Sequence, residues 1–379
     1  MKRLTALLLA LLVLYMGVAR GERVAMDAPD DAPLLRTARI RAAGDIMVHA
    51  TQLKMARKSG DSYDFYPQFK LARNALFNAD YTIASLITTI GSMGGADYSG
   101  YKTFNSPESL LDAIKNTGVD FLSLSNEHIL DRGTEGLYQT VQRVEAKGFD
   151  HGGANRSLAE KNTPVIVEIR GIKIALLCYT QGTGGMERNS PEAQRYAVNY
   201  LTEANVKSDV SRAKAEGAEV IILVAHWGEE YKDTPDEQIV KLAKQLIAAG
   251  VDVILGSHPH VLQPVQYVTA KLEDGTTRRG LVAYSLGTFI SNLSVDHTET
   301  SVVLDFTLRE TQDGGFEAVN VGAVPIYCWR QDEQIKAVPS MKYAKKSPEG
   351  MDSTRRARMR ASLSEAQKVM GSKIVILEE

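Results

Sequence analysis

Cysteine is scarce in this chain of 379 residues, which contains only Cys178 and Cys328. Two cysteines are too few for a disulfide framework, and neither belongs to a C-x-x-C pair of the kind that binds zinc. Cys178 lies in the apolar run "IKIALLCY", which favours a buried free thiol. A strong charge of one sign is lacking as well, since the formal net charge is −2 at pH 7. This balance excludes a general attraction to nucleic acid or anionic membranes, so no nucleic-acid partner is expected.

Long apolar runs are missing everywhere except at the start of the chain. Lys2 and Arg3 precede "LTALLLALLVLYMGVA", which ends near Ala19 and is typical of a secretory signal peptide. The run is short for a membrane span, and an uncleaved N-terminal anchor is the alternative. We therefore expect a signal peptide or anchor in residues 1–19 and a polar linker in residues 20–36. The rest of the chain is expected to be exported, either extracellular or anchored to the outer face of the cytoplasmic membrane.

Short apolar runs alternate with amphipathic segments along the remaining chain. The runs are rich in β-branched residues and predict strands at 38–43, 81–86, 119–124, 165–169, 172–179, 220–225, 251–256, 280–286 and 301–308. Segments that end on glycine predict helices between them, one with Pro107 at its first position and one with a capping box at Thr234 and Glu237. Hairpin turns follow from about residue 262. This order predicts an α/β fold with mixed sheets.

Polar residues collect just past the ends of four predicted strands. Asp45 follows the first strand, with His49 four residues later, and the motifs "SNEHILDRG", "HWGEEY" and "GSHPH" follow three others. In "HPH", two imidazoles separated by one residue project the same way if the segment is extended. Imidazole and carboxylate groups from separate strand ends are ligands that suit Zn, Mn, Fe or Ni. The pattern predicts a metal site, with Trp227 and Glu230 packing around His226 to position it.

These motifs resemble the capsule-synthesis CapA family, which belongs to the calcineurin-like metallophosphatase superfamily. The resemblance runs from about residue 38 to about 330 and includes "GDIMVH", "GYKTFNSPESLLDAIKNTGVDFLSLSNEHILDRG", "HWGEEY", "GSHPHVLQ" and "YSLGTFISN". It implies a four-layer α/β/β/α sandwich in residues 37–334 that carries two divalent metal ions, Mn, Fe or Zn. It also implies a role at the cell surface in making or attaching poly-γ-glutamate capsule. The implied partner is that anionic polymer or another cell-envelope component, with membrane association through the N-terminus.

The resemblance also implies roles for individual residues. The family's metal ligands correspond to Asp45, His226, His258 and His260. His128 corresponds to a histidine that contacts the developing charge of the substrate, and Asp131 would orient its ring.

Three positions depart from the family pattern. Glu127 stands where the family has a metal-binding asparagine, and Ile87 stands where it has a glutamate that would bridge two metals. Thr288 likewise replaces an asparagine. One hypothesis is that Glu127 reaches across and partly replaces the bridge. The other, which we favour, is that the site binds one metal weakly or none, because a bridge must lie between two ions about 3.5–4 Å apart.

Three functions remain open at this point. The first is an exported metal-dependent hydrolase or transferase that acts on a phosphoester or a γ-glutamyl amide. The second is a non-catalytic capsule-assembly component that binds an anionic polymer, and the third is a surface-binding module unrelated to capsule.

Three further segments each have a structural and a functional interpretation. Residues 335–379 are expected to be a C-terminal extension with a basic helix capped by Ser353 or Thr354, either solvated or in contact with an anionic lipid or polymer. Residues 94–105 are either a surface loop or a substrate-gating loop. Residues 151–157, "HGGANRS", are either a structural turn or an anion-holding turn.

Overall fold

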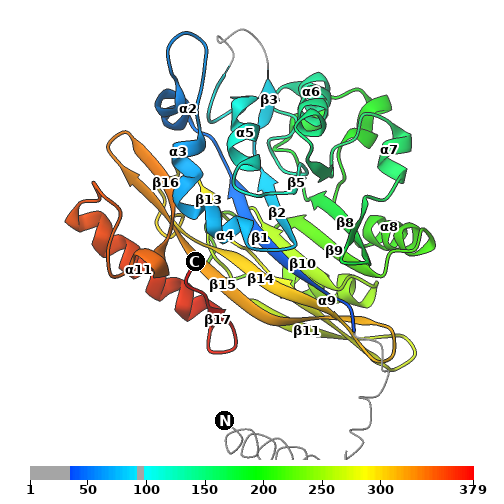
Figure 1. The fold of residues 1–379 in the computed structure, drawn as a ribbon. Coiled ribbons are helices and arrows are strands. Elements are labelled where there is room, and N and C mark those ends of the chain that lie inside the picture. Colours follow the sequence, from blue (N-terminus) through cyan, green and yellow to red (C-terminus); the bar gives the residue numbers. More distant parts are fainter. Residues whose placement is uncertain (1–34, 92–97) are drawn as a thin grey trace, which may run out of the picture. The chain divides into compact units, whose positions relative to one another are not determined.

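Two mixed β-sheets face each other in the computed structural model, which describes residues 35–91 and 98–379 (Figure 1). The first sheet contains β1 (Thr37–Ile46), β2 (Tyr81–Leu86), β5 (Phe121–Ser123), β6 (Asp150–Gly152), β13 (Thr288–Ile290), β14 (Thr300–Glu310), β15 (Phe316–Gln331), β16 (Gln334–Pro339) and β17 (Val375–Ile376). Its order is β16-β15-β14-β1-β2-β5-β6, with β13 beside β1 and β17 beside β15.

The second sheet and a small separate one complete the strands. The second sheet contains β7 (Ile166–Ile169), β8 (Ile172–Thr180), β9 (Val220–His226), β10 (Val253–Ser257), β11 (Val265–Lys271) and β12 (Thr277–Ala283). Its order is β11-β12-β10-β9-β8-β7. The small sheet pairs β3 (Thr89–Gly91) with β4 (Asn105–Pro107). The strands predicted from apolar runs all appear, because each run has the length and composition of a strand buried on one or both faces.

Helices flank the two sheets. They are α2 (Ala50–Ala56), α3 (Tyr66–Phe69), α4 (Arg73–Phe77), α5 (Ser109–Lys115), α6 (Gly133–Ala146), α7 (Leu158–Asn162), α8 (Glu203–Ala215), α9 (Glu237–Ala248), α10 (Ser340–Tyr343) and α11 (Ser353–Met370). Short 3₁₀ segments occur at η1 (Lys70–Ala72), η2 (Met186–Asn189) and η3 (Glu192–Ala197). Helices α2 to α6 pack on the first sheet, and α8 and α9 pack on the second.

Strand β9 shows how one strand serves two hydrophobic layers. Ile222 and Val224 pack between the sheets, whereas Ile221 and Leu223 pack against α8 and α9. Successive side chains of a strand point to opposite faces, so an unbroken apolar run fills both layers at once. The resulting order of layers is helices, sheet, sheet, helices. This confirms the α/β fold with mixed sheets and the four-layer α/β/β/α sandwich.

Two helix starts differ from the prediction. Pro107 ends strand β4, and α5 begins two residues later at Ser109, because β3 recruits residues 105–107 as its partner. The cap of α9 is Asp236, whose Oδ1 accepts a hydrogen bond from the backbone N–H of Ile239 at 2.8 Å. The predicted capping box at Thr234 was therefore wrong by two residues. An Asp with extended backbone satisfies the first helical N–H groups as well as a Thr does, and sequence spacing alone does not separate them.

The C-terminal segment packs onto the first sheet and is continuous with it. Strand β16 pairs with β15, and residues 36–379 form one compact unit without a boundary at residue 335. Helix α11 lies along β15 with Met359, Ala366 and Met370 buried (Figure 1). Its cap is Asp352, which accepts a hydrogen bond from the N–H of Arg355 at 2.7 Å, so the predicted cap at residue 353 or 354 was wrong.

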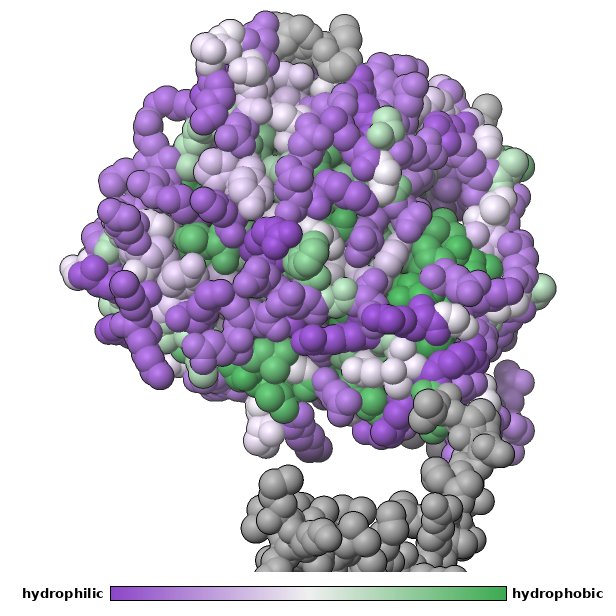
Figure 2. Space-filling model, viewed as in Figure 1, coloured by the Kyte–Doolittle hydropathy of each residue, from purple (hydrophilic) through white to green (hydrophobic). Residues whose placement is uncertain are grey.

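Some predicted features lie outside the described residues. They are the signal peptide or anchor at 1–19, all but the end of the linker at 20–36, and the start of the loop at 94–105. No helix within residues 35–91 and 98–379 is long and apolar enough to cross a membrane. The face shown in Figure 2 is mostly hydrophilic, and its hydrophobic residues form separate small patches.

The strand directions determine where the predicted site residues meet. Strands β1, β2, β5 and β6 run parallel in the first sheet, and β8, β9 and β10 run parallel in the second. Loops that follow parallel strands emerge at the same edge of a sheet, which is where α/β folds place their ligands. The residues after β5, β9 and β10 are therefore brought together with the end of β1.

Candidate metal centre

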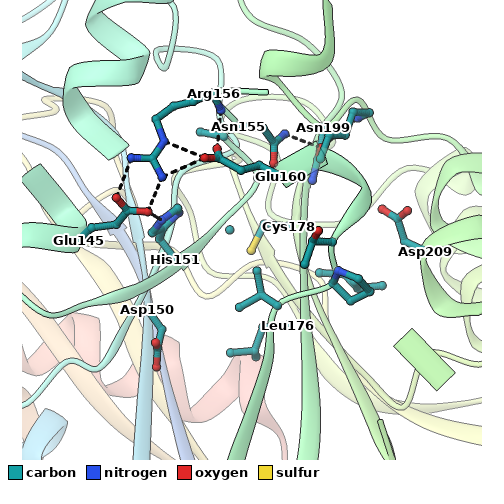
Figure 3. Close-up of a pocket in the computed structure, with 18 of the residues that line it drawn as sticks. Glu145, Asp150, His151, Asn155, Arg156, Glu160, Leu176, Cys178, Asn199 and Asp209 are labelled. Atoms are coloured by element: carbon teal, nitrogen blue, oxygen red, sulfur yellow. Dashed lines mark hydrogen bonds and ion pairs between the residues drawn. The ribbon is translucent and has the colours of Figure 1, made fainter. Parts of the chain in front are cut away.

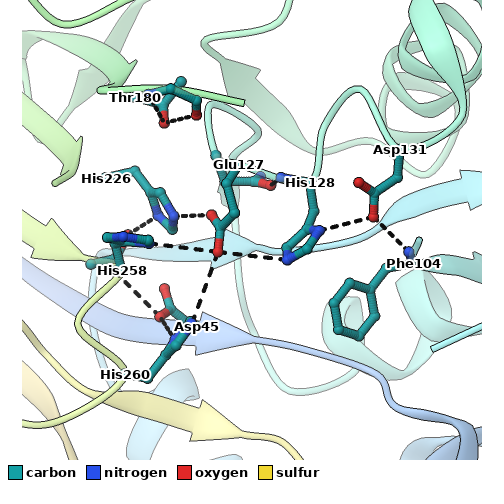
Figure 4. Close-up of polar contacts among 12 residues, drawn as sticks. Asp45, Phe104, Glu127, His128, Asp131, Thr180, His226, His258 and His260 are labelled. Atoms are coloured by element: carbon teal, nitrogen blue, oxygen red, sulfur yellow. Dashed lines mark hydrogen bonds and ion pairs between the residues drawn. The ribbon is translucent and has the colours of Figure 1, made fainter. Parts of the chain in front are cut away.

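Glu127 lies at the centre of four histidines (Figure 4). One carboxylate oxygen, Oε2, lies against Nε2 of His226 at the end of β9. The other, Oε1, is 3.6 Å from Nδ1 of His258 and 3.9 Å from Nε2 of His260. It is also 3.7 Å from Nε2 of the neighbouring His128. A single carboxylate thus faces imidazole nitrogens contributed by both sheets.

Asn126 holds the loop that carries Glu127. Its amide nitrogen donates hydrogen bonds to the backbone oxygens of Leu86 at 2.8 Å and Leu124 at 3.1 Å, and its amide oxygen accepts one from the N–H of His128 at 2.9 Å. The side chain is buried and satisfied by the backbone. Asn126 therefore fixes the shape of the loop, and Glu127 is the residue that faces the centre.

In three of the histidines the ring nitrogen Nδ1 has a partner that orients the other ring nitrogen, Nε2. Nδ1 of His260 is 2.9 Å from Oδ2 of Asp45, and Nδ1 of His226 is 2.8 Å from the hydroxyl of Ser257. In each ring a partner on Nδ1 leaves Nε2 directed at Glu127. His128 has the same arrangement, because its Nδ1 lies 2.9 Å from Oδ2 of Asp131. This is how proteins fix the tautomer of histidines that bind metal.

The turn between β10 and β11 is not the extended segment that we predicted for "HPH". His258 and His260 have φ values of 95° and 60°, in the left-handed region that side chains other than glycine rarely adopt. Tyr231 shares this conformation with φ of 63°, and its N–H donates to the oxygen of Pro259 at 2.8 Å. The rings of His258 and His260 are 5.9 Å apart. A strained turn, braced by the segment after β9, therefore brings the two imidazoles together.

Unpartnered polar atoms are concentrated at this centre. Among the described side chains, ten buried nitrogen or oxygen atoms make no hydrogen bond, and five of them are Asp45 Oδ1, both oxygens of Glu127, His226 Nε2 and His258 Nδ1. Buried polar atoms normally have partners, because leaving them bare costs about 1–3 kcal/mol each. Carboxylate oxygens and imidazole nitrogens that face one another without hydrogen bonds fit a divalent cation. The residues present therefore fit the metal that the resemblance implies.

Glu230 is a candidate ligand that the sequence analysis missed. Its carboxylate lies with Glu127, His258 and His260 in a group whose ligand atoms are all within 4.8 Å of one another. We predicted that Glu230 would position His226, together with Trp227. Trp227 is indeed buried and donates its indole N–H to the backbone oxygen of Tyr284. The spacing of four residues between His226 and Glu230 was the available signal in the sequence. That spacing predicts a ligand only if the chain turns back toward the centre after β9, and the sequence does not show this turn.

The charges of the cluster follow from its contacts. Burial by itself raises the pKa of Glu127, but the neighbouring His226 and His258 outweigh it and hold that pKa well below its usual range. Burial lowers the pKa of His226, which keeps its imidazole neutral and able to ligate. For His128, the lowering effect of burial is outweighed by the hydrogen bond that its ring donates to Asp131 and by the charge of Glu127, so its pKa is raised.

Ile87 makes one wall of the centre apolar. It is fully buried and packs with Met47, Phe104 and Leu293. Phe104 also places its ring edge-on to His128, with centroids 4.6 Å apart, and donates its N–H to Asp131 at 2.6 Å. No ligand therefore comes from position 87, where a bridging carboxylate would be needed for a second ion. Thr288 is buried, and its hydroxyl donates to the backbone oxygen of His260 at 3.1 Å, which is a structural contact.

His49 is not brought into the cluster, although its sequence position placed it near Asp45. Its ring lies 5.2 Å from that of Phe104, and its Nδ1 accepts a hydrogen bond from the N–H of Asn292 at 3.2 Å. The remaining predicted site residues, Asp45, Glu127, His128, Asp131, His226, His258 and His260, do meet at one place.

Comparison with known proteins gives a family. Residues 39–293 match the family model "Bacterial capsule synthesis protein PGA_cap". The capsule biosynthesis protein CapA of Bacillus anthracis is 26% identical over 273 residues, which cover 70% of this chain and 63% of that protein. The PGA biosynthesis protein CapA of Bacillus subtilis (strain 168) is 27% identical over 216 residues, covering 55% of this chain and 52% of that protein. The chain thus spans between 52% and 63% of the length of these relatives.

Solved structures resemble the chain only distantly. The Haemophilus influenzae NAD nucleotidase NadN gives a TM-score of 0.46 at 13% identity, covering 89% of this chain and 64% of that one. The calcineurin-like phosphoesterase YfkN from Bacillus subtilis gives 0.45 at 18% identity, covering 87% and 98%. Both scores are below 0.5, so the fold assignment rests on the sheets and helices of this chain. The family match covers most of the chain, and the protein therefore belongs to the bacterial capsule synthesis protein family.

Proposed function

We propose that this protein is an exported, metal-dependent hydrolase or transferase of capsule synthesis or attachment. Its substrate is poly-γ-glutamate or a related anionic polymer of the cell envelope, and it acts outside the cytoplasmic membrane or anchored to the outer face of that membrane. The observation that carries the proposal is that buried atoms of Asp45, Glu127, His226 and His258 that make no hydrogen bond lie in one cluster around Glu127. The name of the Bacillus subtilis relative, PGA biosynthesis protein CapA, supports the polymer, and the name of the Bacillus anthracis relative supports capsule synthesis.

One divalent ion is the number that the residues support. The ligand atoms of Glu127, Glu230, His258 and His260 form a single group, and Ile87 contributes none on the adjoining wall. An ion held there would polarise a substrate oxygen and lower the pKa of a bound water toward neutrality. The first hypothesis was that Glu127 partly replaces the missing bridge, and a one-metal site agrees with it because this carboxylate faces histidines from both sheets. The second hypothesis was that the site binds one metal weakly or none, and a one-metal site agrees with it in the number of ions.

The His128–Asp131 pair supplies the protein's own contribution to the reaction. Asp131 holds Nδ1 of His128, so Nε2 points toward the centre beside Glu127 (Figure 4). The raised pKa of His128 keeps a proton available on this ring. His128 is thereby placed to stabilise negative charge on a substrate oxygen or to protonate a leaving group.

The test is the chain length of poly-γ-glutamate after incubation with the purified full chain and manganese, with a synthetic phosphodiester as a second substrate. We expect cleavage or transfer that EDTA abolishes and that His128→Ala reduces about 100-fold or more. Arg309→Ala, at an exposed pair on β14, is the matched control and should retain full activity. If neither substrate is altered with Mn, Fe or Zn present, the catalytic proposal is wrong.

A non-catalytic, polymer-binding component is the second candidate, and Ile87 is the observation that favours it. An isoleucine in place of a bridging carboxylate is what a degraded two-metal site would contain. The double change Ile87→Glu/Glu127→Asn restores the family pattern. Activity in that variant alone would identify the natural chain as a pseudoenzyme, whereas activity in the natural chain without gain in the variant excludes this candidate.

A further inference from the structure

A second cavity lies at the edge of the sandwich, where β6 of the first sheet approaches β8 of the second (Figure 3). It encloses about 340 Å³, and none of the candidate metal ligands lines it. Its floor is apolar and includes Leu176 and Cys178, both buried. The "HGGANRS" turn and helices α7 and α8 supply a polar rim. This volume lies in the range of small-ligand sites, and the mixture of an apolar floor with a few polar groups is typical of them.

Most charges on the rim neutralise one another. Arg156 binds Glu145 through two hydrogen bonds of 2.7 Å and binds Glu160 at 2.9 Å (Figure 3). Across the cavity, Arg212 pairs with Asp209, which also accepts a hydrogen bond from the hydroxyl of Tyr179. These groups need no ligand to balance their charge.

Two charged rim residues are exceptions. Asp150 is exposed and accepts a hydrogen bond from the hydroxyl of Tyr81 at 2.6 Å, and Lys161 is half-buried. Within the described part of the chain Lys161 forms no ion pair, and its ammonium donates one hydrogen bond, to Oδ1 of Asn199 at 3.0 Å. The same oxygen accepts from Asn155 at 3.1 Å. Burial lowers the pKa of Lys161, and Asp209, the acidic residue that acts on it, is already engaged. A partly buried ammonium with two unused N–H donors is what an anion in the cavity would satisfy.

His151 offers the complementary group on the opposite wall. Its Nε2 lies 3.3 Å from Oε1 of Glu145, and its Nδ1 is buried without a hydrogen-bond partner. When Nε2–H donates to the carboxylate, Nδ1 keeps its lone pair and accepts a hydrogen bond. Figure 3 shows Cys178 between His151 on one side and Asn199 and Asp209 on the other. The cavity thus has a cation on one wall and an acceptor on the other, above an apolar floor.

We propose that this cavity binds a small carboxylate that also carries a hydrogen-bond donor, such as an amino acid, with its carboxylate at Lys161 and its donor at His151. The aliphatic part of such a ligand packs on Leu176. Inorganic phosphate provides the anion without the aliphatic part, and a dicarboxylate such as glutarate provides no N–H for His151. The site is separate from the metal centre and goes beyond the proposed function.

The test is titration calorimetry of the manganese-loaded full chain with L-glutamate, glutarate and inorganic phosphate as probes. We expect L-glutamate to bind and to lose at least tenfold in affinity in Lys161→Met, which keeps the aliphatic stem. Lys207→Met, at an exposed lysine of α8, is the matched control and should bind normally. His151→Phe should weaken glutamate at least threefold and leave glutarate unchanged. His258→Ala, which damages the metal centre, should bind glutamate as the natural chain does.

A measurement on the unmutated chain covers the case in which a variant does not fold. Glutamate should protect Lys161 from acetylation by acetic anhydride, read by mass spectrometry, while Lys207 reacts at the same rate with and without it. The proposal is overturned by absence of glutamate binding, by equal binding in Lys161→Met, by loss of binding in His258→Ala, or by phosphate binding as tightly as glutamate. An inactive protein that still binds glutamate at Lys161 would contradict the proposed function alone.

Discussion

Glu127 places one negative charge among the histidines of the metal centre, and its replacement is the sharpest test at the scale of a single residue. Glu127→Gln keeps the shape and removes the charge that His226, His258 and His260 face. We expect manganese or zinc affinity to fall about tenfold or more. Competition with a fluorescent chelator measures it, with Glu229→Gln at an exposed neighbouring site as control. Equal metal affinity in Glu127→Gln and Glu229→Gln would show that Glu127 is not a metal ligand.

Ile87 determines how many ions the centre holds. Its side chain is buried against Met47 and Phe104, where it contributes no ligand atom. We expect one equivalent of metal in the natural chain and two in Ile87→Glu/Glu127→Asn, because a carboxylate at 87 completes a second set of ligands. Elemental analysis after desalting gives the number. Two equivalents in the natural chain would show that Ile87 does not limit occupancy.

At the scale of secondary elements, the start of α2 contains a half-buried histidine that makes the fold sensitive to acid. Burial lowers the pKa of His49 to about 4, from an ordinary value of 6.5. The unfolded chain therefore takes up this proton first, so the stability associated with neutral His49 is complete above pH 6.5 and is lost as the pH falls toward 4. Between pH 7 and pH 4.5 the loss is about 2–3 kcal/mol.

Urea unfolding of the natural chain and of His49→Asn at these two pH values checks this effect. Asparagine is a good helix cap, so the variant should retain α2. The natural chain should lose about 2–3 kcal/mol more than the variant on acidification. The same loss in both proteins would mean that His49 is protonated at its ordinary pKa when folded.

The cap of α11 gives a second test at this scale. Asp352 accepts the hydrogen bond from the N–H of Arg355, whereas the sequence pattern favoured Ser353 or Thr354. Asp352→Ala should lower the free energy of unfolding by about 1 kcal/mol, because it leaves a helical N–H without its acceptor. Ser353→Ala should change it by less than about 0.5 kcal/mol. Thermal unfolding of the two variants compares these losses. A larger loss in Ser353→Ala than in Asp352→Ala would show that Ser353 caps the helix.

At the scale of the whole molecule, a buried ion-pair network joins the sheet, a helix and the C-terminal residue. Arg41 of β1 is fully buried and contacts Asp305 of β14 at 2.7 Å, Glu379 at 2.5 Å and the backbone oxygen of Asn74 in α4 at 2.9 Å. Removing one partner leaves a buried charge unpaired. Asp305→Ala should therefore destabilise the protein by about 3–5 kcal/mol.

The control for this network is a surface pair on the same sheet. Arg309 and Glu317 lie on β14 and β15 with about half of each side chain exposed. Glu317→Ala should cost at most about 1 kcal/mol, because exposed pairs gain little in water. Chemical denaturation of both variants gives the comparison. Similar losses would show that Arg41 remains satisfied by Glu379 alone.

Short-range patterns were sufficient to locate the strands and most of the metal-centre residues, whereas the four layers of the sandwich were expected only from the family resemblance. An apolar run such as residues 220–225 indicates a strand with both faces buried, and β9 is buried along its whole length. Polar residues after such runs were expected at one sheet edge, and Asp45, His226 and His260 are found there.

Contacts between distant positions depended on the folded chain. Asp45 and His260 are 215 residues apart, and the direction of Glu127 depends on Asn126 bonding back to β2. The strained turn of His258 and His260 and the burial of Arg41 have no local signature either. The spacing of Glu230 and the "HGGANRS" turn were local signals, but only the folded chain shows that Glu230 joins the ligand group and that this turn lines a cavity. Periodicity reports which face of one element is buried, whereas the distance between two side chains is determined by strand order and by the packing of the two sheets.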